Sequence, residues 1–140
     1  MKISSVEIAF RLESIKKSGI IFNELLGAGA KYSSGEESAF LFECLKKGLK
    51  IYYVPEKIAS LHIGNSSWFK GYNKEYFISK GAAFAAMSKK LCLILILQFA
   101  IRKYKIYKNN VTFIEVLKHM LNGRKMYNNE ITNTIKSNFL

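Results

Sequence analysis

The sequence predicts an α/β fold, with short strands and helices in the first half of the chain and a mostly helical region after them. Three observations support this prediction. Residues 3–10 alternate between hydrophobic and polar side chains, as a half-buried strand does. Residues 50–54 form a second strand-like run, the expected partner of the first, and Pro55 would end it. Between these runs, hydrophobic residues recur at helical spacing from residue 40.

The segments between the two predicted strands are expected to be helical. Residues 12–17 predict a short helix that ends at a glycine. A longer helix is predicted over residues 35–47, because Ser34 and Glu37 have the spacing of a capping box. Two lysines and a glycine at positions 46–48 mark the end of this helix.

Helices are also predicted in most of the second half, after a short extended piece at residues 58–62. The aromatic-rich segment 66–87 predicts one helix, or two helices broken near Gly81. Residues 111–121 carry another helical stripe, which would end at the Asn-Gly pair that follows. The polar tail beyond Tyr127 is expected to be a frayed helix or disordered.

Residues 91–101 form a mostly aliphatic run, with lysines at positions 89–90 before it and Arg102-Lys103-Tyr104-Lys105 after it. A helix needs about 20 apolar residues to cross a bilayer, so this run of 11 is too short to span one unaided. Two interpretations remain open. The helix could lie in a membrane interface with its basic residues on lipid phosphates, or it could pack inside the protein.

The composition excludes several kinds of site. The 140 residues include 22 basic and 10 acidic side chains, a net charge of +12, and every acidic residue is a glutamate. Without aspartate, the chain cannot by itself form an Asp-x-Asp metal pair, an EF-hand loop or an aspartate-containing catalytic triad.

The positive charge is concentrated in the second half, where residues 61–140 carry a net +10 and residues 1–60 only +2. Such an excess attracts a polyanion, either nucleic acid or the anionic face of a membrane. No known nucleic-acid module is visible, and a membrane surface accounts for both the aliphatic run and its basic flanks. We therefore expect an anionic membrane surface as a partner, and no nucleic acid.

The two cysteines, Cys44 and Cys92, lie in apolar runs and lack a Cys-x-x-Cys spacing. They are expected to be buried free thiols in a reducing compartment. The first residues lack the continuous apolar core of a signal peptide. The expected location is therefore cytoplasmic, peripheral on the inner face of the cell membrane.

The most informative segment is the small-residue loop that precedes Glu36 and Glu37. Its glycines do not match a dinucleotide fingerprint or a P-loop, so they are expected to allow a tight turn or a close approach to a ligand. Two carboxylates at the start of a helix could serve a sugar-transfer site. They could equally be structural, with Glu37 closing a capping box and both stabilised by the helix dipole.

Several motifs, taken in order, resemble the C-terminal half of family 2 glycosyltransferases of the bacterial polysaccharide-assembly type. No single motif is decisive, but their order and spacing cover about residues 3–87. The motifs are Phe10-Arg11, Phe22-Asn23-Glu24 with Gly27-Ala28-Gly29, Gly35-Glu36-Glu37, Lys47-Gly48-Leu49-Lys50-Ile51-Tyr52-Tyr53-Val54-Pro55, His62, Ser66-Ser67-Trp68-Phe69-Lys70-Gly71-Tyr72 and Lys80-Gly81-Ala82.

The resemblance implies a GT-A fold and an inverting hexosyltransferase that moves a sugar from a nucleotide-sugar to a hydroxyl of a glycan or lipid-linked acceptor. It assigns the general base to Glu37, with Glu36 as its support or as an acceptor contact. The family usually has Asp where this chain has Glu, so either residue could be the base. His62, alone an ordinary packed or surface residue, matches a position where some members bind metal or diphosphate. The expected acceptor-binding residues are Gly27, Ala28, Gly29, Gly35 and Trp68.

The chain lacks the nucleotide-binding half of such an enzyme, whose Asp-x-Asp motif would hold a divalent metal, Mg²⁺ or Mn²⁺. The resemblance thus implies an acceptor-side fragment that is inactive without a separately supplied partner half. Residues 1–64 are expected to be the end of the catalytic domain, 65–127 a basic helical extension and 128–140 a polar tail. The alternative is a non-enzymatic, basic, membrane-peripheral protein in which the two glutamates only cap a helix.

Overall fold

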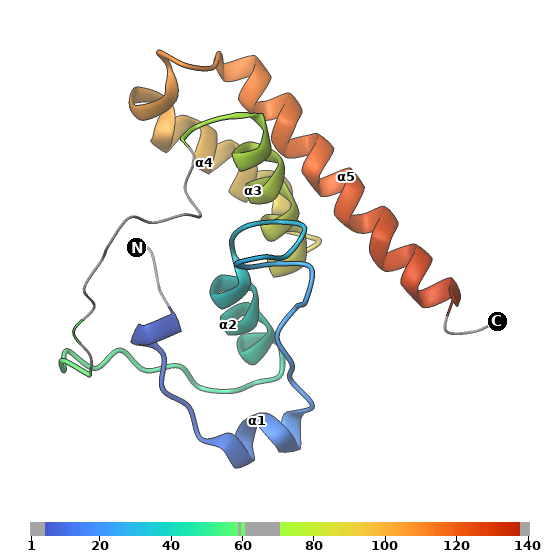
Figure 1. Ribbon diagram of the computed structural model, residues 1–140. Helices are drawn as coiled ribbons and strands as arrows, with labels where there is room; N and C mark the ends of the chain where they lie inside the picture. The colour runs from blue at the N-terminus through green and yellow to red at the C-terminus, as the bar shows by residue number, and fades with distance from the viewer. Residues whose placement is uncertain (1–4, 59, 61–70, 138–140) are drawn as a thin grey trace.

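The computed structural model describes residues 5–58, 60 and 71–137 of the chain. The regular secondary structure of these residues is helical. Helices α3, α4 and α5 lie together, α2 lies against α3, and α1 lies beyond α2 (Figure 1). The elements are the short 3-10 helix η1 (Ser5–Glu7) and the α-helices α1 (Leu12–Ser18), α2 (Glu36–Lys46), α3 (Lys74–Met87), α4 (Cys92–Tyr107) and α5 (Phe113–Ser137).

The predicted α/β fold is wrong for the described residues, which form an all-α structure. Residues 5–7 are a 3-10 turn instead of part of a strand, and residues 50–58 have no regular structure. The one strand-like pairing among the described residues is an isolated bridge between Leu26 and Tyr32. Alternating hydrophobic and polar side chains give a strand one apolar and one polar face. A strand also needs a neighbouring strand, however, to accept and donate its backbone hydrogen bonds. The described residues of 50–58 make no such backbone pairing.

The most extensive helix contact joins α3 to α5, and glycines allow it. A Cβ atom on Gly81 of α3 would lie 1.9 Å from the backbone oxygen of Met120. A Cβ atom on Gly123 of α5 would lie 2.0 Å from the backbone oxygen of Ile78. Each helix thus presents a glycine to the backbone of the other. Both glycines are buried, and so are Ala82 and Met120 beside them.

Helix α4 completes the core by burying one of its faces. Cys92, Ile96, Ala100 and Tyr107 are the buried residues of this helix, at helical spacing. The Tyr107 hydroxyl donates a hydrogen bond of 2.6 Å to the backbone oxygen of Ala100, which satisfies a polar group in the core. The opposite face of α4 stays exposed, so this helix is partly buried and partly a surface element.

The N-terminal segments pack on α2 through a second, smaller core. Ile20, Phe40 and Cys44 are buried there, and the ring of Phe22 stacks on that of Phe40 at a centroid distance of 4.2 Å. The prediction of two buried free thiols is confirmed, since Cys44 lies in this core and Cys92 in the larger one.

The predicted helix at residues 12–17 is confirmed as α1, and the one at 35–47 as α2, within a residue at each end. Helix α3 runs through Gly81 without a break. The predicted stop at residues 122–123 is wrong, because α5 continues to Ser137. Gly123 is not a helix end. It is the position where α5 approaches α3, so its lack of a side chain serves packing.

Replacing Gly123 with alanine should destabilise the protein by about 2–3 kcal/mol, because the new methyl group would push the α3 backbone away. Urea denaturation followed by circular dichroism would measure this change. The exposed neighbour Asn122→Ala is the matched control and should change stability little. Equal stability of the two variants would show that the helices are not in close contact.

Candidate functional site

The glycine-rich loop is closed by backbone hydrogen bonds. The amide of Gly27 donates to the backbone oxygen of Tyr32 at 2.8 Å, and the amide of Tyr32 donates to that of Leu25 at 3.0 Å. Inside the turn, the amide of Ala30 donates to the Gly27 oxygen at 3.2 Å. Gly27 and Gly29 have φ values of 113° and 79°, which favour glycine, so the glycines permit the turn.

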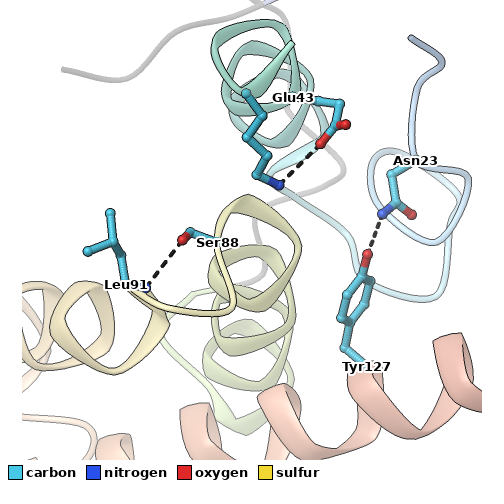
Figure 2. A network of polar contacts seen from close by, with 6 residues as sticks. Asn23, Glu43, Ser88, Leu91 and Tyr127 are labelled. Carbon is cyan, nitrogen blue, oxygen red and sulfur yellow. Dashed lines mark hydrogen bonds and ion pairs between the residues drawn. The ribbon is translucent and has the colours of Figure 1, made fainter. Parts of the chain in front are cut away.

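Side chains from α3 and α5 hold this loop in place. The Asn23 side-chain amide donates a hydrogen bond of 2.6 Å to the Tyr127 hydroxyl of α5 (Figure 2). The Asn23 oxygen accepts a bond from the Leu25 amide at 3.0 Å, so one side chain both shapes and anchors the loop. The Tyr32 ring is buried, with 1% of its surface exposed, and lies at 6.2 Å from the Tyr127 ring. On the surface, Lys31 pairs with Glu130 of α5.

Helix α2 begins directly behind the loop and brings Glu36 onto Gly27. A Cβ atom on Gly27 would lie 1.7 Å from Oε2 of Glu36, so the carboxylate occupies the space that a side chain would need. The predicted capping box is wrong: Gly35, not Ser34, is the residue that caps the helix, and no side chain bonds to its first turn. Gly35 has a φ of 98°, and a Cβ atom there would lie 2.4 Å from that of Ala83. Glycine thus lets α2 start close against α3.

Partial burial and the neighbouring charge of Glu37 raise the pKa of Glu36 above its ordinary value. The folded protein therefore holds this proton more tightly than the unfolded chain does. Glu36 therefore lowers the free energy of unfolding as the pH rises from the ordinary carboxyl pKa to the raised pKa of the folded state. Nearby, burial first and the charge of Glu130 second raise the pKa of Tyr32 to about 12, so its hydroxyl stays neutral. The site thus contains two adjacent carboxylates, and that of Glu36 packs against Gly27 of the loop.

The structure brings together four of the predicted site residues and leaves others apart. Gly27, Gly35, Glu36 and Glu37 form one cluster at the head of α2. Ala28 and Gly29 lie exposed at the tip of the same loop. The predicted acceptor contact Trp68 and the possible metal ligand His62 lie outside the described residues.

The described residues do not form a metal site. Among them, no group of three or more His, Cys or Glu side chains is placed to hold a metal ion. The two glutamates alone do not fit the divalent metal expected for the complete enzyme, so no step here depends on one.

Sequence reasoning missed the residues that anchor the loop. Asn23 was recognised only as part of a motif, while Tyr32 and Tyr127 were not singled out. Asn23 and Tyr127 are 104 residues apart. No local pattern signals a contact of that range, although a buried tyrosine that needs a hydrogen-bond partner is a general expectation.

Helix α4 forms a second surface of interest, since its outward face is apolar. Leu93, Ile94, Leu97 and Ile101 are between 49% and 64% exposed and follow helical spacing. Basic residues flank this face at positions 89–90, 102–103 and 105. Among the described residues, no helix is both long enough and apolar enough to cross a bilayer.

Comparisons with family models, with curated proteins and with solved structures found no match to this chain.

The pKa of Glu36 should fall when Glu37 is replaced by glutamine, because one of the two causes of its elevation is removed. It should remain above the ordinary value, since burial is the larger cause. Carbon-detected NMR titration of the glutamate carboxyl groups would measure both effects. Glu24→Gln, an exposed change in the same loop, should leave the Glu36 titration unchanged. An unperturbed Glu36 in the unmodified protein would contradict its placement on Gly27.

Proposed function

We propose that this chain is the acceptor-side portion of an inverting glycosyltransferase that uses a nucleotide-sugar to extend a cell-surface polysaccharide. The observation that carries the proposal is the cluster at the head of α2, where Glu36 rests on Gly27 with Glu37 beside it. The order of motifs along the chain gives this cluster its interpretation.

In the proposed reaction, Glu37 accepts the proton of an acceptor hydroxyl as that oxygen attacks the anomeric carbon of the donor sugar. The bond between this carbon and the nucleotide diphosphate breaks, and the diphosphate leaves with the electron pair. A positioned carboxylate is a common general base for such a step. Glu36 is a positioning residue. Its carboxylate packs on Gly27 of the loop, and this contact holds the start of α2, and with it Glu37, in place. Both carboxylates lie in the first turn of α2, where the helix dipole attracts negative charge, but for Glu36 burial and the charge of Glu37 outweigh this attraction and raise its pKa.

The proposal includes a partner that carries the nucleotide-binding half. Supporting it, residues 50–58 make no backbone hydrogen bond to other described residues, and Tyr52, Tyr53 and Val54 are 63–81% exposed. A contiguous run of exposed large hydrophobic side chains marks a surface that another chain or domain would cover. This run follows the C-terminal end of α2, whereas the two glutamates lie at its N-terminal end, so a partner that completes the site would have to extend along this helix (Figure 1).

Reconstituted transfer tests the proposal. This chain, expressed together with a nucleotide-binding half encoded immediately upstream, should release nucleoside diphosphate from a nucleotide-sugar in the presence of acceptor. Glu37→Gln should lower the rate by about 100-fold or more, because the base is lost while shape is kept. Chromatographic detection of the nucleoside diphosphate would measure the rate.

The matched control is Glu24→Gln, which removes an exposed carboxylate of the preceding loop and should keep full activity. Full activity in Glu37→Gln would show that Glu37 is not the base. Failure of every combination to release diphosphate, with both chains folded, would contradict the glycosyltransferase proposal itself.

A second candidate function, a membrane-peripheral role, is favoured by the apolar outer face of α4 and its basic flanks. The face is suited to lie in a membrane interface, while the basic residues contact anionic headgroups. This role is compatible with transfer to a lipid-linked acceptor. It could also stand alone, with the two glutamates serving only to start α2.

The double substitution Leu97→Gln and Ile101→Gln should reduce binding to vesicles that contain phosphatidylglycerol by at least about tenfold, because two apolar side chains no longer enter the interface. Flotation of the protein with vesicles, at low and high salt, would measure this. The control Ile21→Gln with Ile58→Gln changes two similarly exposed residues elsewhere. Equal loss in both doubles, or no flotation of the unmodified protein, would contradict the assignment of this face.

A further inference from the structure

Two adjoining open cavities lie where the end of α2, the turn between α3 and α4, and the second half of α5 meet. Their volumes are about 250 Å³ and about 460 Å³, and they share Ala85, Lys89 and Ile131 as lining residues. Figure 2 shows residues of these three elements, namely Glu43 of α2, Ser88 and Leu91 of the turn, and Tyr127 of α5. Of these, Ser88 and Tyr127 line the larger cavity. We call these two cavities together the basic pocket.

Four cationic side chains from three elements line the basic pocket. Lys46 comes from the end of α2, Lys89 and Lys90 come from the turn, and Arg124 comes from α5. No carboxylate lines either cavity among the described residues. Lys46 forms a 3.1 Å ion pair with Glu43, whereas the described residues provide no ion pair for Lys89, Lys90 or Arg124. These last three like charges repel one another, so an anion bound among them would offset that repulsion.

Arg124 is the central cation of this set. It is half-buried, and its guanidinium offers five donors in a planar fork that suits a phosphate group. The positive charge of Arg124 acts on the thiol of Cys92, which lies in the first turn of α4. Burial raises the pKa of the Cys92 thiol, and Arg124 partly opposes that rise. Cys92, the first residue of the 16-residue α4, lines the same cavity as Arg124, so the N-terminal end of this helix lies beside that cavity.

Polar and apolar residues continue the pocket along α5. Asn128 and Thr132 follow Arg124 at intervals of four residues, so all three lie on one face of the helix. Asn128 adds a side-chain amide that can donate hydrogen bonds to anion oxygens, whereas the Thr132 hydroxyl donates to the backbone oxygen of Asn128 at 2.9 Å. Ala85, Ile131 and Ile135 supply an apolar wall beside the cations. This combination suits a ligand with a phosphate group attached to a less polar portion.

We propose that the basic pocket binds the phosphate group of an anionic ligand, held by Arg124, Lys89 and Lys90 with Asn128. The phosphate can belong to a free phosphate compound or to a lipid headgroup. The exposed apolar face of α4 begins at this pocket, which makes a lipid source geometrically accessible. The pocket is separate from the Glu36–Glu37 cluster, so its occupation does not depend on the sugar-transfer proposal.

An NMR titration of the full chain at low ionic strength tests the proposal, with sodium pyrophosphate as the probe. Saturable amide shifts are expected at residues 88–92 and along α5 at residues 124–132. The double variant Arg124→Gln with Lys89→Gln should bind at least tenfold more weakly. The control double Lys108→Gln with Lys118→Gln removes the same charge outside the pocket, at two exposed residues, and should bind within about twofold of the unmodified protein.

A second titration, with dihexanoyl phosphatidic acid below its critical micelle concentration, separates the two sources. Binding at least tenfold tighter than pyrophosphate supports a lipid headgroup, and similar binding of both supports a free phosphate compound. Equal weakening in the two double variants would overturn the proposal, because the attraction would then be general. Shifts confined to other residues, or no saturable binding, would overturn it too, whether or not the pocket variants fold.

Discussion

The close approach of α3 and α5, made possible by Gly81 and Gly123, is the contact on which the rest of this structure depends. Each glycine faces a backbone carbonyl of the other helix, so the two axes lie closer than side chains would allow. This brings Tyr127 of α5 to Asn23 and places Ala83 of α3 under Gly35. The loop and the start of α2 are therefore fixed by a helix pair that is far away in the sequence.

The helices could be predicted from sequence because their signals are local. Helix α2 has an apolar stripe and a basic last turn, and its predicted bounds agree within a residue. The aliphatic run at residues 91–101 marks the first part of α4, which continues to Tyr107. The strands were predicted equally locally and were wrong, since alternation in residues 3–10 and 50–54 says nothing about whether a partner strand is present. Gly123 shows the same difficulty in a helix. An Asn-Gly pair usually ends a helix, and only the tertiary contact with Ile78 gives this glycine another role.

The candidate site was partly predictable in the same way. The adjacency of Glu36 and Glu37 and the small-residue loop before them are properties of the sequence. The packing of the Glu36 carboxylate on Gly27 is not, and neither is the cap of α2, which is Gly35 instead of the expected Ser34. A carboxylate used as a base must be accessible and yet fixed in place. Here the Glu36 carboxylate is held against the turn at Gly27, and Glu37 is held by its place in the first turn of α2.

The central proposal is that this chain supplies one side of a site, and that a nucleotide-binding half completes it. Hydrogen–deuterium exchange of the chain, with and without that half and a nucleotide-sugar, tests it most directly. We expect the half to protect residues 50–58 and the loop at residues 27–35, the segments that flank the two ends of α2. Unchanged exchange in both segments, with the two proteins mixed at high concentration, would contradict the account.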